Sequence, residues 1–229
     1  MPSKSGKSDL YDDIKRRVLT LELKPGRDLD EVALSREFGI SRTPLRDVFR
    51  QLAGEGYLEI RNNRGACVAP MSHQTLRDFF LVAPMIYSAI GRLAAQNATK
   101  EQLKDLKQAQ TGFRNALKTD RPGDLVYYND RFHTIMGEMA DNVFLLPSLR
   151  RLLIDHARIG QTFYRPKDDG MKTRLRTAAD QHDEFIALIE ARDEDGVARL
   201  VDKHWELSRD HIELFITPDA LPLELPQSA

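Results

Sequence analysis

Apolar residues along the first 56 positions repeat at the spacing of a helix, and this pattern predicts three short helices. Turn-forming residues separate them, with Pro25 after the first helix and Gly39 after the second. Asp30 and Ser41 belong to residue types that cap helix N-termini, and they precede the second and the third helix. The apolar positions are Leu10, Ile14, Val18, Leu19 and Leu21, then Val32, Ala33, Leu34 and Phe38, then Val48, Phe49 and Leu52.

Two short runs of strand-forming residues come next, at 57–60 and 66–69, on either side of the turn-forming sequence at 61–65. These runs predict a β-hairpin. Helices followed by such a hairpin indicate a winged helix-turn-helix, which we expect to span residues 10–70.

The pattern changes after a predicted linker at residues 71–75, because residues 76–216 read as helical and contain no run typical of a strand. Pro84 is expected to kink the first of these helices or to shift its start. The polar residues 1–9 predict a disordered N-terminus, and the proline-containing residues 217–229 predict a flexible tail. The predicted helices lie near 74–96, 100–118, 122–140, 145–164, 172–192 and 194–216.

Length and composition suit a two-domain globular protein. The chain has 229 residues, of which 41% are hydrophobic and 30% charged. We find no stretch that approaches the roughly 18 apolar residues of a membrane span, and the polar N-terminus lacks the apolar segment of a secretion signal. We therefore expect a cytoplasmic protein with no membrane partner. The single cysteine, Cys67, excludes an internal disulfide and argues against a thiolate-rich metal site.

The positions of the cations matter more than their sum. The net charge is −1, and residues 1–70 carry 13 Lys and Arg against 11 Asp and Glu. The third predicted helix opens with the polar run Ser41–Thr43 and carries Arg46 one turn later. Helix N-termini attract phosphate, arginines bind guanine edges, and a cation at a wing tip, here Arg64 before Gly65, reaches the minor groove. This placement predicts binding to double-stranded DNA. The alternatives are a solvated charged face and a winged helix that binds another protein.

The sequence LSREFGISRTPLRDVFRQLAGEGYL at residues 34–58, followed by NRGA at 63–66, resembles the GntR family of bacterial transcription regulators. The resemblance covers almost the whole predicted winged domain and implies an operator in double-stranded DNA. Val32 stands where the fatty-acid-responsive branch of the family has an arginine, so the operator is expected to differ from the one that branch binds. The implied DNA-binding residues are Ser41 on phosphate, Arg42, Thr43 and Arg46 on the operator, and Arg64 and Gly65 in the wing.

Histidines in the second half stand on helices that could bring them together. Asn129 and His133 are four residues apart and share one face of a predicted helix, while His182 and His204 lie in the last two helices. Imidazole suits zinc and nickel, and three histidines with one oxygen ligand can form a metal site inside a bundle. The alternative for each histidine is a capped or surface position, which is commoner for a lone histidine in a helix.

The segments NDRFH at 129–133 and HDEFIALIEARD at 182–193, together with His204, resemble the FCD domain that accompanies this winged helix in one large subfamily. The resemblance covers roughly residues 76–216. It implies an antiparallel all-helical bundle, and hence a mainly α chain, that binds a small organic acid as effector. The metal ligands it implies are Asn129, His133, His182 and His204.

Two positions depart from the FCD pattern. Asn129 replaces the usual aspartate, and its neutral amide leaves a bound divalent ion with nearly its whole charge. We expect this neutral ligand either to weaken metal binding or to strengthen the attraction of the bound metal for an anionic effector. Ala83 and Tyr87 stand where the family has an arginine and a glutamate, and that arginine often holds a carboxylate. Arg158 is the candidate effector-binding residue that would compensate.

The sequence therefore predicts a homodimeric DNA-binding transcription regulator, a repressor, whose operator affinity is controlled by a small-molecule effector. The alternative is a metal-dependent helical enzyme fused to a DNA-binding module, because an open metal site can activate water. We find no glycine-rich phosphate loop, nucleophile elbow or His-Glu-x-x-His pair to support it.

Overall fold

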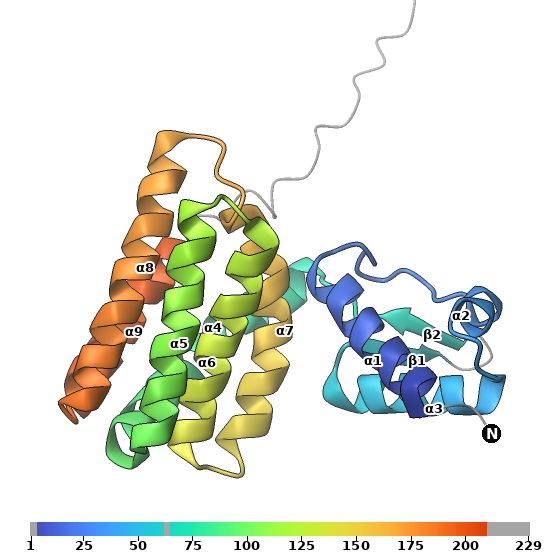
Figure 1. Ribbon diagram of the computed structural model, residues 1–229, viewed down its shortest axis with the longest axis horizontal. Helices are drawn as coiled ribbons and strands as arrows, with labels where there is room; N and C mark the ends of the chain where they lie inside the picture. The colour runs from blue at the N-terminus through green and yellow to red at the C-terminus, as the bar shows by residue number, and fades with distance from the viewer. Residues whose placement is uncertain (1–3, 62–64, 210–229) are drawn as a thin grey trace, which may run out of the picture.

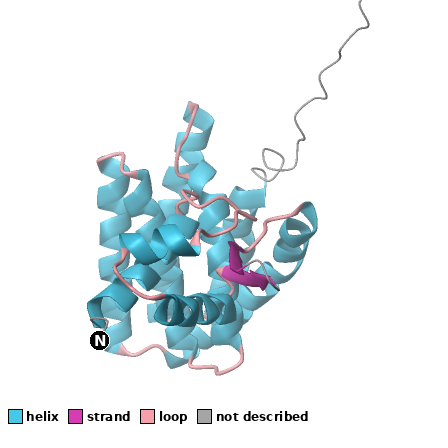
Figure 2. Cartoon of the chain, turned by 90° about the vertical axis from the view of Figure 1, so that its right-hand side faces the viewer, coloured by secondary structure: helices cyan, strands magenta, loops and turns pink. Residues whose placement is uncertain are grey.

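The N-terminal unit is a winged helix-turn-helix, and it lies beside a larger helical unit (Figure 1). The computed structural model describes residues 4–61 and 65–209. Two strands pair antiparallel with Leu58 opposite Val68, and Figure 2 shows them as a short ribbon among helices. The elements of this unit are α1 (Lys4–Leu19), α2 (Glu31–Glu37), α3 (Arg42–Glu55), β1 (Leu58–Arg61) and β2 (Gly65–Val68).

Local chemistry fixes the ends of α2 and α3. The carboxylate of Asp30 accepts hydrogen bonds from the backbone N–H groups of Val32 and Ala33, both at 2.9 Å, and so caps α2. Gly56 ends α3 at a φ of +92°, a left-handed conformation that glycine adopts without strain. The side chain of Arg151 passes so close to Gly56 that a Cβ atom there would overlap it. The left-handed φ is what favours glycine at this position, because the half-exposed Arg151 side chain can move aside.

The helical unit is an antiparallel bundle, as the FCD resemblance implies, and the mainly α fold class is confirmed. Helix α4 packs against α6, α7, α8 and α9, while α5 packs against α6 and α8. Apolar side chains from all six helices fill the interior. The helices are α4 (His73–Asn97), α5 (Lys100–Lys118), α6 (Pro122–Ala140), α7 (Leu145–Phe163), α8 (Asp169–Glu190) and α9 (Glu194–Arg209).

Three boundaries differ from the sequence prediction. Helix α1 begins at Lys4, inside the segment expected to be disordered, because polar residues give no apolar period to read. Helix α4 begins at His73, inside the predicted linker 71–75, because Ser72 Oγ accepts a hydrogen bond from the backbone N–H of Thr75. Helix α8 begins at Asp169, three residues early, behind the cap Asp168.

Two predictions concern helix continuity and membrane insertion. Pro84 lies inside α4, which continues through it to Asn97 because its apolar face stays buried against α6 and α9. Helix α4 is long and apolar enough to cross a membrane by length and composition, which the sequence analysis did not expect. In the structure this helix lies in the bundle, where Ala83, Tyr87 and Ile90 are buried. The described residues contain no other helix that meets the criteria for a membrane span.

Some predictions fall outside the described residues. The wing tip with Arg64 lies there, as do the predicted end of the last helix at residues 210–216 and the predicted flexible tail at 217–229.

The two units meet along α7. Arg158 Nη2 donates to the backbone carbonyl of Ala69 at 2.7 Å, and Gln161 Nε2 donates to the carbonyl of Leu19 at 2.9 Å. Arg158 is fully buried and forms an ion pair with Asp155 at 3.0 Å. Side chains of one helix of the bundle therefore satisfy backbone groups at the end of α1 and after β2.

Candidate functional site

The first candidate surface is the N-terminal half of α3. Ser41 precedes the helix with an extended backbone and makes no side-chain cap hydrogen bond, so its hydroxyl is available. Arg42, Thr43, Arg46 and Arg50 are all exposed on the same helix. The structure thus brings the predicted cations and hydroxyls to one helix end, which is the arrangement that enters a major groove.

Arg46 is held by a residue that the sequence analysis did not consider. Its Nη2 lies 3.1 Å from Glu31 Oε2, and its Nε is within 3.3 Å of both carboxylate oxygens. Glu31 is the first residue of α2, where a carboxylate also favours the helix dipole. Glu31 also lies beside Gly65, where a Cβ would be 3.3 Å from its Oε1. Helices α2 and α3 and the start of β2 therefore meet at the ion pair between Arg46 and Glu31.

The second candidate site is a buried cluster of histidines. Asn129 and His133 project from one face of α6, His182 from α8 and His204 from α9. Asn129 is 5% exposed, and His182 is fully buried. One ring nitrogen from each of His133, His182 and His204 lies within 4.8 Å of the others, as in a set of metal ligands.

Hydrogen bonds from two glutamines fix which ring nitrogens carry a proton. Gln110 Nε2 donates to Ala179 O at 2.7 Å and to Asp183 Oδ1 at 2.9 Å, so its Oε1 must accept from His182 Nδ1 at 3.2 Å. His204 Nδ1 lies 2.8 Å from Gln181 Oε1, which also accepts. Both rings are left with a lone pair on Nε2, the form that binds a metal.

Three ring nitrogens in the cluster are buried without a partner among the described residues: Nδ1 and Nε2 of His133, and Nε2 of His182. A buried polar atom without a hydrogen bond costs roughly 1–3 kcal/mol of stability. Two of these three atoms are free lone pairs, one on His133 and one on His182, because the neutral His133 ring keeps one N–H. Buried lone pairs without a partner fit a site that is completed by a cation, so the residues present match a divalent metal.

Burial keeps these rings neutral. Desolvation lowers the pKa of His204 to about 3 and that of His156 to about 4. Desolvation and the neighbouring imidazoles hold the pKa values of His133 and His182 well below the usual range. The rings of His133, His156, His182 and His204 are therefore neutral at neutral pH, and each keeps one nitrogen lone pair, as metal ligation requires.

A fourth histidine, His156 on α7, was not predicted. Its Nδ1 is 2.8 Å from the hydroxyl of Tyr87, and its ring centroid is 5.2 Å from that of His133. With Asn129 and His204 it lines a cavity of about 20 Å³, which is room for about one water molecule or ion. No sequence pattern pointed to His156, because it shares no helix and no spacing with the other three histidines.

Asp130 and Arg158 do not belong to this set of residues. Asp130, the neighbour of Asn129, does not join the histidines; it is mostly buried, and desolvation raises its pKa to about 6. Arg158 does not line the cavity, because its guanidinium is committed to Ala69 and Asp155 at the junction of the two units. In this structure Arg158 joins the two units, and its effector-binding role stays a prediction.

Comparison with known proteins finds a matching family for each half of the chain. The family described as bacterial regulatory proteins, gntR family, matches residues 7–68, and the FCD domain family matches residues 82–207. The HTH-type transcriptional repressor RspR of Escherichia coli K12 is 27% identical over 89% of this chain and 87% of its own length. The Nta operon transcriptional regulator of Aminobacter aminovorans is 27% identical over 85% of this chain and 89% of its own. Among solved structures, E. coli McbR/YncC shares the fold with a TM-score of 0.74 at 18% identity, covering 91% of this chain and 96% of that one.

Proposed function

The chain belongs to the GntR family of bacterial regulatory proteins and carries an FCD domain, and we propose that it is a cytoplasmic repressor whose operator affinity is set by a small anion bound at a metal in the bundle. The observation that carries this proposal is the convergence of three buried, neutral histidines from three helices. We assign operator binding to residues 10–70 and effector sensing to residues 76–216.

The metal would be held by Asn129, His133, His182 and His204, and the imidazole-rich set favours zinc or nickel. When bound, such an ion supplies positive charge and open coordination positions for an anion. Asn129 is uncharged, so it neutralises none of the charge of the ion. Gln110 and Gln181 hold the His182 and His204 rings in the tautomer whose Nε2 has a free lone pair for the ion.

The effector is proposed to be a small organic acid recognised chiefly through the metal. Ala83 is buried and uncharged at the position where the family places an arginine, and Arg158 faces elsewhere. The cavity of about 20 Å³ is too small for an organic molecule in its present shape. Binding must therefore move the side chains around it, which favours one conformation of the bundle over another.

Helix α7 is the proposed connection to DNA. His156 lines the cavity, while Arg158 and Gln161 on the same helix hold Ala69 and Leu19 of the DNA-binding unit. A shift of α7 that widens the cavity would be transmitted through these hydrogen bonds to the spacing of two recognition helices. An effector can act in this way only through different affinities for the two states.

We assign dimerisation to the exposed face of α4. Leu81 and Met85, one turn apart, are each 70% exposed, and Val82 is 42% exposed. Apolar residues gathered on one exposed helix face are typical of a protein interface. A second copy of this chain is the proposed partner, because a two-fold operator requires a two-fold dimer.

We assign sensing rather than catalysis to the histidine site, because membership of a regulator family accounts for both halves of the chain. A turnover assay of the zinc-loaded protein against small esters and organic acids should detect no product. Metal-dependent turnover that is lost in His133→Ala would favour the enzyme instead.

The proposed function is tested by selecting operators from random double-stranded DNA with the full-length protein. The expected result is enrichment of an inverted repeat whose half-sites lie about one helical turn apart, roughly 10 base pairs. An Arg46→Ala variant carried through the same selection should enrich nothing. Failure of the unmodified protein to enrich any sequence would overturn the DNA assignment.

A further inference from the structure

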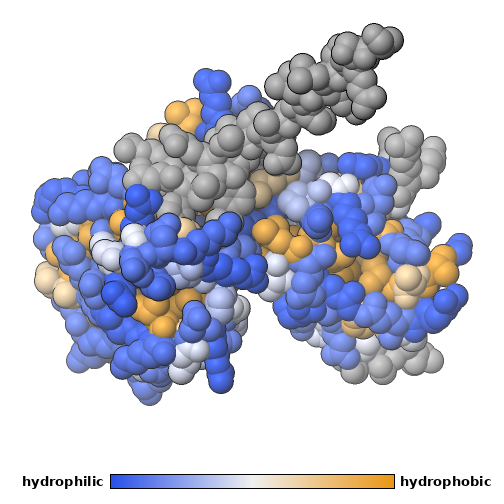
Figure 3. Space-filling view, turned by 90° about the horizontal axis from the view of Figure 1, so that it is seen from above, coloured by the Kyte–Doolittle hydropathy of each residue, from blue (hydrophilic) through white to orange (hydrophobic). Residues whose placement is uncertain are grey.

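A second, larger pocket opens at one end of the bundle, where the α5–α6 turn meets the α7–α8 loop. Both connections lie at the top of the bundle in Figure 1, and Figure 3 looks onto that end, where hydrophilic residues predominate. The pocket measures about 700 Å³, within the range of roughly 300–1,000 Å³ that small-molecule sites occupy. It shares no lining residue with the histidine cavity.

The pocket is lined by five cationic side chains and one carboxylate, Asp120. Lys118 ends α5, Arg165 lies in the α7–α8 loop, and Arg176 projects from α8. All three are exposed and form no ion pair with any residue that the structure describes. Three unpaired cations from three segments converge here, so their charge is available to a ligand.

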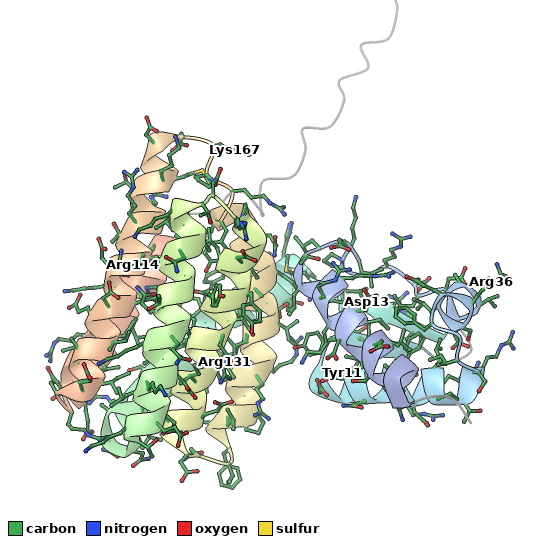
Figure 4. All side chains as sticks on the ribbon, in the orientation of Figure 1. Tyr11, Asp13, Arg36, Arg114, Arg131 and Lys167 are labelled. Carbon is green, nitrogen blue, oxygen red and sulfur yellow. The ribbon has the colours of Figure 1, made fainter. Side chains whose placement is uncertain are left out.

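The other two cations are already paired. Arg114 donates from Nε to Asp183 at 2.8 Å and from Nη2 to Asp180 at 2.8 Å (Figure 4). Lys172 lies 2.9 Å from Asp169, which is almost fully exposed, so water screens this pair. Arg114 is held in place by its two ion pairs. The three unpaired cations are therefore the ones expected to bind the charged group of a ligand.

The base of the pocket is apolar. Leu125 and Leu175 are almost fully buried and belong to a hydrophobic cluster, with Leu117 packed at its edge. Helix α6 begins in this wall, and its N-cap residue Arg121 offers no side-chain acceptor to the first backbone N–H groups. The N-terminus of α6 therefore adds to the positive potential above an apolar surface.

We propose that this pocket is a second ligand site and that it takes a small organic phosphate with an apolar ring or chain. Arginine side chains bind phosphate oxygens with two N–H groups at once, and Arg165 and Arg176 both line the pocket. The apolar part of the ligand covers Leu117, Pro122 and Pro166, which line the pocket and are only partly buried. An inorganic anion would leave this apolar surface exposed to water, so it should bind more weakly than an aromatic phosphate.

The test is calorimetric titration of the full-length protein with phenyl phosphate, with inorganic phosphate and benzoate for comparison. Phenyl phosphate should bind saturably and more tightly than either comparison. The double variant Arg165→Gln/Arg176→Gln should weaken it by at least about tenfold, because two charge-assisted hydrogen bonds are lost. The matched control Lys104→Gln/Arg199→Gln, which removes two exposed cations elsewhere on the bundle, should change the affinity less than about twofold.

Two further variants keep the result interpretable. Lys118→Gln, at an exposed position, should by itself weaken the binding of phenyl phosphate. This single variant tests the role of the cations if the double variant unfolds. His182→Ala removes a proposed metal ligand and should leave phenyl phosphate binding intact, which separates this site from the metal. Absence of saturable binding, equal affinity in the double variant, or loss of binding in His182→Ala would each overturn the proposal.

Discussion

Each histidine of the cluster can bind a metal only when the correct ring nitrogen carries the proton. At His182 that proton sits on Nδ1, because Gln110 uses both its amide hydrogens on Ala179 and Asp183 and can only accept. At His204 the acceptor is Gln181. These glutamines would position the proposed ligands without themselves contacting a bound metal.

Replacing Gln110 should therefore weaken the metal site without destroying it. We expect Gln110→Ala to lower the affinity for zinc by about 10- to 100-fold, because the His182 ring loses its fixed orientation and tautomer. Competition with a chromogenic chelator measures the effect. Gln108→Ala, exposed on the same helix, is the control and should bind zinc as the unmodified protein does. Equal zinc affinities for the two variants would refute the positioning role of Gln110.

Arg46 is the residue on which direct base recognition is expected to depend. Arg46→Ala should reduce operator affinity by about tenfold or more, since a bidentate contact to guanine contributes roughly 1–3 kcal/mol. Its melting temperature should stay the same, because the side chain is more than half exposed and its ion pair with Glu31 lies at the surface. Fluorescence anisotropy with the selected operator measures this, with Arg199→Ala as the control. An unchanged affinity would remove Arg46 from the DNA contact.

At the scale of elements, α7 carries two functions on one helix. His156 is among its residues that line the cavity, and its junction residues Arg158 and Gln161 donate hydrogen bonds to the DNA-binding unit. The buried carboxylate of Asp155 pairs with Arg158 and so supports one of the two junction contacts.

Two arginines of α7 allow a matched comparison. Arg158→Ala should lower the free energy of unfolding by about 3 kcal/mol, because Asp155 and the Ala69 carbonyl lose a buried partner. Arg151→Ala should cost less than about 1 kcal/mol, because Arg151 is half-exposed and Asp155 keeps its bond to Arg158. Urea denaturation measures both changes. Equal losses in the two variants would show that burial does not distinguish these pairs.

Helix α4 is expected to decide the oligomeric state. Leu81→Asp places a charge in the proposed apolar interface, so it should shift the protein from dimer to monomer. Analytical ultracentrifugation measures the change, and Val143→Asp, at another exposed apolar position, is the control. A dimer that persists in Leu81→Asp would place the interface on another face.

Periodicity predicted the types and most of the bounds of these elements, because buried faces repeat where helices and strands form. It failed at α1 and α4, where the ends depend on polar residues such as Ser72 that leave no apolar period. For the site, the resemblance to the FCD domain implied His133, His182 and His204, which the structure does bring together. It could not find Gln110 or His156, because their places follow only from how the helices pack.

At the scale of the whole molecule, a winged helix-turn-helix is joined to a helical bundle that buries a histidine cluster in its interior. The two units share backbone hydrogen bonds along one helix, so a change in the bundle has a direct physical route to the DNA-binding unit. The proposed control of DNA binding by a metal-bound effector requires that the histidine cluster binds a metal.

The most direct test is the metal content per chain, measured by elemental analysis on full-length protein purified without a histidine tag. We predict about one equivalent of zinc, nickel or a similar divalent ion per chain, as a single histidine site requires. The metal should be lost in His182→Ala while the helical content stays the same. A protein that holds no metal even after soaking with zinc, or a variant that retains it fully, would contradict the account.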